Sequence, residues 1–200
     1  NRSASKTNAL ADEGAVVVGS PKEVGENSDY VFICVTNSGD VVDVINGSEQ
    51  VHGLSKGLRP GMIVVDHSTI SPDVTREIYA DLSDLQVSLI DAPVSGGDKG
   101  AIAGTLSIMC GGDEDSLQKV MPLLESMGKQ ITHCGPSGAG QTVKLCNQIA
   151  VCINNFALAE ALVFCTLNQV DPAVMLEAIS AGAAGSWQIS NLGPQIIQRD

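Results

Sequence analysis

The stretch GAGQTVKLCNQIAVCINNFALAEALVFCTLNQ, residues 138–169, decides how the chain is organised. Between Lys129 and Glu160 the only Lys, Arg, Asp or Glu residue is Lys144. A helix of about 30 residues would be about 45 Å long, more than a small domain needs to cover its own sheet. We therefore expect this helix to bridge two domains.

Polar side chains form a stripe along this helix. At about 100° per residue they fall within an arc of about 120° on a mostly apolar surface. They are Lys144, Asn147, Gln148, Asn154 and Asn155. In one interpretation, Lys144 reaches solvent from a helix end while the amides pair with neighbouring helices. In the other, desolvation lowers the pKa of Lys144 toward neutrality and makes it a useful acid or base.

Apolar runs alternate with helical patterns before this stretch. Strands are predicted at 15–18, 30–35, 62–66, 87–90, 106–110 and 131–134. Helices are predicted at 5–13, 21–26, 40–45, 72–82 and 113–127. The runs at 30–35 and 62–66 lack polar alternation, which is typical of parallel strands covered on both faces. The pattern predicts a doubly wound, mostly parallel α/β sheet.

Only helices are predicted after the long helix, at 172–181 and 187–198. We therefore divide the chain into an α/β domain at 1–135 and a second region at 136–200. The second region contains the long helix and the beginning of an all-α domain.

Composition limits the possible functions. Hydrophobic residues make up 44% of the 200 residues, enough for a real core, and the net charge of −12 argues against a nucleic-acid surface. The six cysteines show no CxxC spacing and are expected to be reduced and structural. Because the chain does not open with a secretory signal and amides interrupt its long apolar stretch, we expect a cytoplasmic protein outside the membrane.

Three polar loops are expected to meet at one edge of the sheet, since ligands of open α/β sheets bind beyond the carboxyl ends of the strands. These loops begin at Thr36, His67 and Asp91. Farther along the third, Ser95, Gly96 and Gly97 offer a hydroxyl and unobstructed backbone N–H groups, which suit a carboxylate; an ordinary glycine turn is the alternative. His67 and His133 lie far apart in the sequence and have too few carboxylate neighbours for a ligand cluster, so no metal site is predicted.

Two segments together resemble a known family. They are DAPVSGGDKGAIAGTLSIMCGG at 91–112 and CGPSGAGQTVKLCNQ at 134–148. They are similar to the β-hydroxyacid dehydrogenases, which include 3-hydroxyisobutyrate dehydrogenase, tartronate semialdehyde reductase and glyoxylate/succinic semialdehyde reductase. The likeness extends more distantly to 6-phosphogluconate dehydrogenase. VVDHSTISP at 64–72 and AGAAGSWQISNLGP at 181–194 match further family signatures.

The resemblance implies an NAD(P)-dependent oxidoreductase with a Rossmann-type nucleotide-binding domain at 1–135. The reaction would be the reversible oxidation of a small, 3-hydroxyisobutyrate-like β-hydroxy acid to its semialdehyde. Lys144 matches the catalytic lysine that relays the proton of the substrate hydroxyl. Ser95, Gly96 and Gly97 match the loop that binds the substrate carboxylate, and Asn147 matches the amide that holds the substrate.

The resemblance also implies cofactor contacts. Thr69 matches a contact near the nicotinamide ribose, and Val35 and Thr36 match the loop on the adenosine side. Arg2 would lie near the adenosine ribose, where a cation favours a 2′-phosphate and hence NADP. An exposed arginine near the chain end is the alternative, so the cofactor is expected to be NAD or NADP.

Family members begin with a strand and a GxGxxG turn, and they end with further helices, neither of which is found here. We therefore expect a fragment of a longer enzyme, inactive on its own, whose complete form is a homodimer or homotetramer. Two alternatives stay open: a non-catalytic scaffold, and a sensor that holds the acid or the nucleotide without turnover.

Overall fold

The computed structural model describes residues 4–48 and 51–198. The chain forms two compact units, Asn1–Lys144 and Leu145–Asp200, so their boundary falls inside the long helix α7 (Ala139–Leu167). Each unit is described by itself. The domain division expected at residue 135 stays a prediction.

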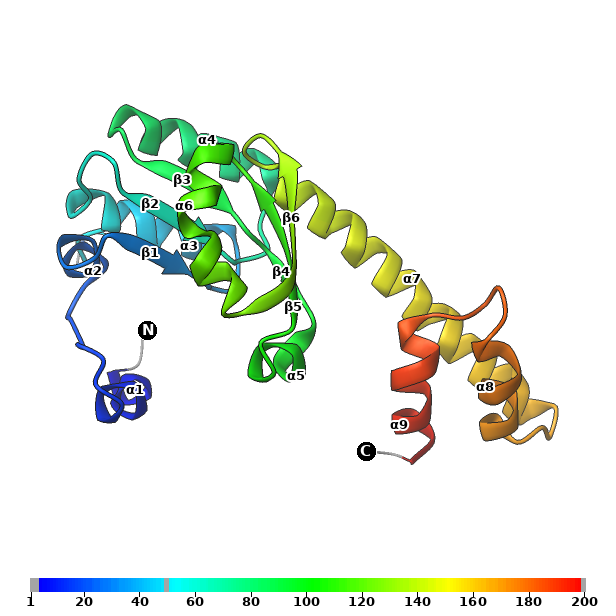
Figure 1. Ribbon diagram of the computed structural model, residues 1–200. Helices are drawn as coiled ribbons and strands as arrows, with labels where there is room; N and C mark the ends of the chain where they lie inside the picture. Colours follow the sequence, from blue (N-terminus) through cyan, green and yellow to red (C-terminus); the bar gives the residue numbers. More distant parts are fainter. Residues whose placement is uncertain (1–3, 49–50, 199–200) are drawn as a thin grey trace. The chain divides into compact units, whose positions relative to one another are not determined.

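A six-stranded sheet is the centre of the first unit in the described part of the chain (Figure 1). Its strands are β1 (Tyr30–Ile33), β2 (Ile63–Asp66), β3 (Ser88–Asp91), β4 (Val94–Ser95), β5 (Leu106–Gly111) and β6 (Gly128–Gly135). The order is β1-β2-β3-β5-β4, with β6 paired to β5. The first three strands are parallel, and β5 and β6 are parallel to each other.

The sheet is less uniformly parallel than a simple alternation of strands and helices implies. Strand β5 pairs antiparallel with both β3 and β4. The β3 contact is confined to Asp91 opposite Gly111, so β5 meets the end of β3 and then runs along β4. Residues 91 and 111 are thereby neighbours at the edge where β3 ends.

Most helices of this unit begin at residues that suit a helix start. The segments are η1 (Ala4–Thr7), α1 (Asn8–Asp12), α2 (Pro21–Glu26), α3 (Ser38–Asn46), η2 (Leu54–Lys56), α4 (Pro72–Asp84), α5 (Gly97–Ile102) and α6 (Glu114–Glu125). Side chains that accept a bond from a backbone N–H of the first turn precede four of them: Ser20, Asn37, Ser71 and Asp113. Such caps satisfy N–H groups that have no partner within the helix. The expected start of α4 at Ser71 and Pro72 is confirmed.

Apolar side chains form a core on each face of the sheet. Val64 and Leu89 pack into the core that α3 and α4 share, which includes Ile45 and Leu82. Alternate strand residues such as Val65 and Ile90 belong to the opposite core, with Leu117 and Leu124 of α6. Figure 1 shows α6 on one side of the sheet and α3 and α4 on the other. The predicted doubly wound α/β fold is confirmed.

The strand predicted at 15–18 is wrong. These residues form no regular element, and the side chain of Val16 is 87% exposed. Helix α1 just before them has no buried residue. A β-branched run favours an extended chain, but a strand also needs a neighbour that pairs with its backbone.

The second unit contains the rest of α7, α8 (Pro172–Ser180), a π-helical turn at Gln188–Leu192 and α9 (Gly193–Gln198). Its small core is formed by Leu158, Leu176 and Ile189. The predicted long helix is confirmed, with 29 residues. Within the described residues, α7 is the one helix that by length and composition could cross a bilayer, which is weak evidence because core helices of water-soluble proteins meet the same criterion.

Candidate functional site

The loops that follow β1 and β2 are bonded together at the carboxyl edge of the sheet. The Val35 N–H donates to Ser68 Oγ over 2.9 Å, and the Ser71 N–H donates to Ser38 Oγ over 3.2 Å. The structure therefore brings the predicted cofactor residues Val35 and Thr69 into adjacent loops.

The predicted cofactor residues differ in exposure. Thr36 and Thr69 are exposed, so their hydroxyls are accessible to a ligand, while Val35 is half-buried. Arg2 lies outside the described residues. Three of the four predicted cofactor residues are thus placed at this edge, in the loops after β1 and β2.

The loop predicted to bind a carboxylate leaves the end of β4. Ser95 is half-buried and pairs with Ser107 of β5, while Gly96 and Gly97 are exposed, with φ of 135° and 62°. A Cβ at position 97 would meet no atom within 4 Å, so packing does not require a glycine there. The two positive φ angles do favour glycine and keep side chains away from the backbone N–H groups.

A buried carboxylate holds the N-terminus of α7. Asp91 has no exposed surface; its Oδ1 accepts a bond from the Gly138 N–H over 2.8 Å, and its Oδ2 accepts one from the Gln141 N–H over 2.9 Å. Burial raises the pKa of Asp91, and the backbone N–H donors oppose that rise. A negative charge here also complements the helix dipole.

Close packing surrounds this carboxylate. A Cβ on Gly111 would lie 2.5 Å from Asp91 Oδ1, and a Cβ on Gly140 would lie 2.3 Å from the Met109 carbonyl oxygen. Real side chains cannot occupy such positions without moving the backbone. Glycine at both positions therefore lets the start of α7 reach the sheet.

Gln141 joins the same helix turn to the loop after β2. Its fully buried side chain donates from Nε2 to the Ser68 carbonyl over 2.7 Å and accepts at Oε1 from the Ile70 N–H over 3.0 Å. Thr69 lies between these two partners. Neither Gln141 nor a role for Asp91 was predicted from the sequence, although an amide and a carboxylate bordering buried segments were the available signals.

Lys144 lies one turn after Gln141 on α7 and is 7% exposed. Burial lowers the pKa of its ammonium group. No carboxylate in residues 4–48 or 51–198 lies within ion-pair distance of it. Lys144 is therefore buried, which contradicts the interpretation in which it reaches solvent, while its role as an acid or base stays a prediction.

Asn147 follows three residues later on the same helix. Its side chain is half-buried, and its Oδ1 is buried without a hydrogen-bond partner in the described chain. Buried polar atoms in proteins are nearly always bonded. This oxygen is thus suited to accept a bond from a ligand N–H or O–H.

His67 and Asp66 add buried polar groups at the end of β2. His67 Nδ1 lies 2.6 Å from the Ala92 carbonyl oxygen, so Nδ1 carries the proton and Nε2 is an acceptor. Nε2 is buried without a partner in the described residues, and the ring stacks on Phe32. Burial raises the pKa of Asp66 to about 6 and lowers the pKa of His67.

The residues at this edge fit a polar cofactor. Exposed hydroxyls of Thr36 and Thr69 flank the loops, and His67 Nε2 is an acceptor still to be bonded. In the part of the chain that the structure describes, no group of three His, Cys, Asp or Glu side chains could hold a metal ion.

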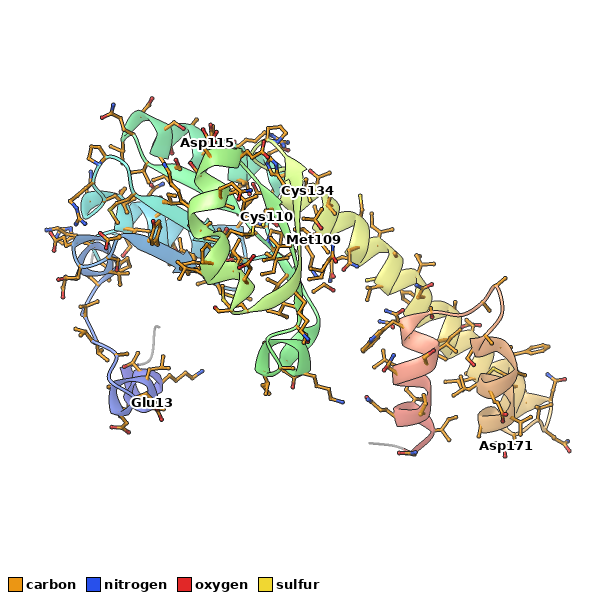
Figure 2. The ribbon with its side chains drawn as sticks, in the orientation of Figure 1. Glu13, Met109, Cys110, Asp115, Cys134 and Asp171 are labelled. Carbon is orange, nitrogen blue, oxygen red and sulfur yellow. The ribbon has the colours of Figure 1, made fainter. Side chains whose placement is uncertain are left out.

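The cysteines are all free thiols. Cys110 of β5 and Cys134 of β6 lie near each other (Figure 2), and burial raises the pKa of Cys110 to about 12, so this thiol is unreactive at neutral pH. Cys34, Cys146 and Cys152 are exposed. Cys34 lies in the loop after β1, and Cys146 and Cys152 lie on α7, so burial does not give these three thiols the structural role that was expected.

The fold and the polar carboxyl edge define a nucleotide-binding α/β protein. Residues 1–135 match the family model for the NAD binding domain of 6-phosphogluconate dehydrogenase. Residues 138–200 match the model for the NAD-binding region of NADP-dependent 3-hydroxyisobutyrate dehydrogenase. The chain belongs to the β-hydroxyacid dehydrogenase family, as its motifs indicated.

Similar proteins agree with this assignment. The chain is 43% identical to the probable 3-hydroxyisobutyrate dehydrogenase-like 1, mitochondrial, of Arabidopsis thaliana, covering 100% of the chain and 59% of the relative. It is 41% identical to the 2-hydroxy-3-oxopropionate reductase of Escherichia coli K12, covering 95% and 65%. The structure of Psf3 in complex with NADP+ and 2-OPP superposes with a TM-score of 0.89 at 28% identity, covering 100% and 69%.

The chain spans 59% to 67% of the length of the curated relatives it matches. Activity, substrate and assembly of the whole protein are therefore matters for proposal.

Proposed function

We propose that the complete protein is an NAD(P)-dependent dehydrogenase that reversibly oxidises a small, 3-hydroxyisobutyrate-like β-hydroxy acid to its semialdehyde. The observation that carries the proposal is Lys144, a buried lysine with a lowered pKa on a helix anchored to the carboxyl edge of a nucleotide-binding sheet. Family membership and the reductase and dehydrogenase names of relatives support it.

Lys144 acts on the proton of the substrate hydroxyl. In the oxidation direction its neutral amine accepts that proton as the hydroxyl carbon becomes a carbonyl. In the reduction direction its ammonium returns the proton to the forming alkoxide. Burial supports both roles, since it brings the pKa of the lysine closer to the working pH of a general acid or base.

Ser95, Gly96 and Gly97 bind the substrate carboxylate through the serine hydroxyl and backbone N–H groups. The two consecutive positive φ angles support this role, since the backbone there carries no Cβ that would obstruct an anion. Asn147 holds the substrate through its amide, and its unpartnered Oδ1 supports this role because it can accept a hydrogen bond from a ligand.

NAD or NADP supplies the hydride acceptor in this reaction when it is bound. Val35 and Thr36 hold its adenosine side, and Thr69 contacts it near the nicotinamide ribose. Their placement in neighbouring bonded loops supports this assignment. Arg2 is proposed to contact the adenosine ribose, so its replacement reports on the preference between the two cofactors.

We further propose that the complete protein is a cytoplasmic homodimer or homotetramer that binds neither nucleic acid nor membrane. The net charge of −12 opposes nucleic-acid binding. Lys144, Asn147 and the other amides of α7 disfavour insertion into a bilayer. Large exposed apolar side chains on α7, including Phe156 and Phe164, support self-association.

Steady-state kinetics on the complete protein test the proposal. We expect 3-hydroxyisobutyrate or a related small β-hydroxy acid to reduce NAD+ or NADP+, followed by the absorbance of the reduced nicotinamide. Turnover together with calorimetric binding of the cofactor distinguishes an enzyme from the alternatives. Micromolar binding without turnover of any small β-hydroxy acid would favour a sensor, and absence of binding would favour a scaffold.

A further inference from the structure

Two buried side chains hold the start of α7, and the proposed chemistry uses neither. The Asp91 carboxylate accepts bonds from the N–H groups of Gly138 and Gln141, and the Gln141 carboxamide bridges Ser68 and Ile70. Both side chains are fully buried. Burying such polar groups is unfavourable unless every bond is made, so their presence calls for a reason beyond packing.

The hydrogen-bond partners of Asp91 are both backbone N–H donors, so both carboxylate oxygens must act as acceptors. Each oxygen faces a backbone N–H, and the N–H of Gly140 also interacts favourably with the charged form. An asparagine would replace one oxygen with an NH2 group that faces a donor. Asparagine has nearly the shape of aspartate but does not satisfy this site.

The partners of Gln141 require one donor and one acceptor. The Ser68 carbonyl needs a donor, and the Ile70 N–H needs an acceptor, which also fixes the orientation of the amide. An ionised glutamate supplies acceptors only. A protonated glutamate has one donor and one acceptor and restores the match.

These bonds join two elements that a nicotinamide-dependent reaction must align. Gln141 precedes Lys144 by one turn of α7, and Ser68 and Ile70 flank Thr69. The same turn therefore fixes the base of the proposed proton transfer and the loop of the proposed cofactor contact. Misplacement of reacting groups by about 1 Å can reduce a rate by about 10².

We propose that Asp91 and Gln141 are positioning residues that set Lys144 and the Thr69 loop in register for catalysis, an inference that rests on the proposed function. Asp91 acts on Lys144 by fixing the first turn of α7. Gln141 acts on both, since it belongs to that turn and bonds directly to the loop. Neither side chain contacts substrate or cofactor in this role.

The test compares Asp91→Asn and Gln141→Glu with the control Asp113→Asn in the complete protein. Asp113 is also a carboxylate that accepts a backbone N–H at a helix start, the Ser116 N–H at α6 over 2.9 Å, but it has no part in the edge loops. For each variant, kcat, KM for cofactor and substrate, and Tm are measured.

We expect Asp91→Asn to lower kcat about 10- to 100-fold at a temperature where it is folded, with a smaller change in KM. Gln141→Glu should raise KM for the cofactor about tenfold near neutral pH. That defect should shrink as pH falls and the introduced carboxyl becomes protonated. Asp113→Asn should leave Tm nearly unchanged, because asparagine caps a helix about as well as aspartate, and should leave kcat and KM within about twofold.

A second readout does not depend on turnover. The pKa of Lys144, measured by NMR after 13C-methylation of the lysines, should rise toward its ordinary value in Asp91→Asn because the helix start loosens and the lysine gains solvent. Removal of a negative charge alone would lower that pKa, so the sign separates repositioning from simple electrostatics. The control should leave it unchanged.

Each result decides a separate question. If the unsubstituted complete protein neither binds NAD(P) nor turns over, the proposed function fails, and the Lys144 pKa still tests the positioning. If both variants keep kcat and KM within about twofold and the Lys144 pKa stays lowered, the positioning role is overturned. Should Asp91→Asn fail to fold, the pH-dependent recovery of Gln141→Glu decides: a defect independent of pH would overturn the role of Gln141.

Discussion

Residues 139–144 at the start of α7 differ from the rest of the helix in which side chains are buried and which are exposed. Gln141 and Lys144 are polar and buried, whereas Ile149, Phe156 and Phe164 are apolar and exposed, with Phe156 at 71%. Protein helices usually show the reverse. Buried polar groups reduce stability unless they are hydrogen-bonded, as Gln141 is, and the buried Lys144 of this segment is the residue to which we assign the proposed proton transfer. Exposed apolar groups indicate a surface that other protein atoms cover.

Replacing Lys144 gives the strongest test of this contrast. We expect Lys144→Met in the complete protein to lower kcat at least about 10², the usual scale for a lost general acid or base. Unlike most core changes it should not reduce the free energy of unfolding at neutral pH, because methionine carries no charge to desolvate. Turnover and denaturant unfolding measured together would show the two effects separating.

The pH dependence of that variant has a definite sign. The folded pKa of Lys144 is lowered, so the folded protein binds fewer protons there than the unfolded chain, and stability rises with pH between the two pKa values. The stability advantage of Lys144→Met should therefore shrink as pH rises toward about 10, the ordinary range for lysine. An advantage that grows with pH would contradict a desolvated ammonium.

Ser95→Ala extends the comparison to the glycine loop. Loss of a hydroxyl that bonds a carboxylate should cost about 1.5–3 kcal/mol, seen mostly as a higher KM for the acid and less as a lower kcat. A matched change of the paired Ser107 to Ala should leave KM unaltered. Unchanged KM in the Ser95 variant would place the carboxylate elsewhere.

Asp66→Asn asks whether buried polar groups at the carboxyl edge are generally unfavourable for stability. The folded pKa of Asp66 is about 6, above its ordinary value, so the protein loses stability as pH rises from about 4 to 6. Asparagine keeps an acceptor for the Ser68 N–H and cannot ionise. We expect the variant to be about 2 kcal/mol more stable at pH 7 and nearly equal to wild type near pH 4.

The neighbours of Asp66 give that prediction a second readout. Burial is the main cause of the raised pKa of both Asp66 and the Cys34 thiol; the charge of Asp91 adds to the rise at Asp66, and the charge of Asp66 adds to the rise at Cys34. The substitution should therefore increase the reactivity of Cys34 at mildly alkaline pH. If wild type and Asp66→Asn have equal Cys34 reactivity and the same pH dependence of unfolding free energy, burial does not destabilise the Asp66 carboxylate.

Phe164→Ser addresses the exposed half of α7 and should have the smallest effect on fold stability, within about 0.5 kcal/mol for an exposed site. Self-association should nevertheless weaken, which sedimentation velocity would detect. Phe164 is 71% exposed, so a large loss of unfolding free energy without a change in assembly would mean that the side chain is covered within one chain.

Much of the fold could be predicted from local pattern. The strands predicted at 30–35 and 62–66, the helix start at Pro72 and the 29-residue helix correspond to observed elements. Burial on both faces is confirmed for β2 but is wrong for β1, where Tyr30 and Phe32 are exposed. The prediction of a strand at 15–18 was wrong because β propensity describes only the preference of the segment itself, while a strand also needs a neighbouring strand to pair with. The antiparallel orientation of β5 could not be predicted either, because the periodicity of apolar residues indicates burial but not whether neighbouring strands are parallel or antiparallel.

The site was predictable where one residue stood out from its neighbours in the sequence. Lys144 is the only charged residue in an apolar segment, which singled it out but left a buried and a solvent-reaching interpretation open until the structure showed it buried. The anchoring of α7 did not follow, since Asp91 and Gln141 lie 50 residues apart and Gln141 and Ser68 lie 73 apart. Hydrogen bonds over such separations depend on the tertiary fold, which a single sequence does not reveal.

The bridge from Gln141 to the loop after β2 also orders events in time during synthesis. Ribosomes add about 5–20 residues each second, so the 73 residues between Ser68 and Gln141 take about 4–15 s to appear. The Ser68 carbonyl and the Ile70 N–H lack their final partner throughout that interval, although the strand before them is already made. The loop after β2 therefore gains its final hydrogen bonds only once the first turn of α7 has been made, and a nascent chain that has not reached residue 141 lacks the two bonds that fix this loop.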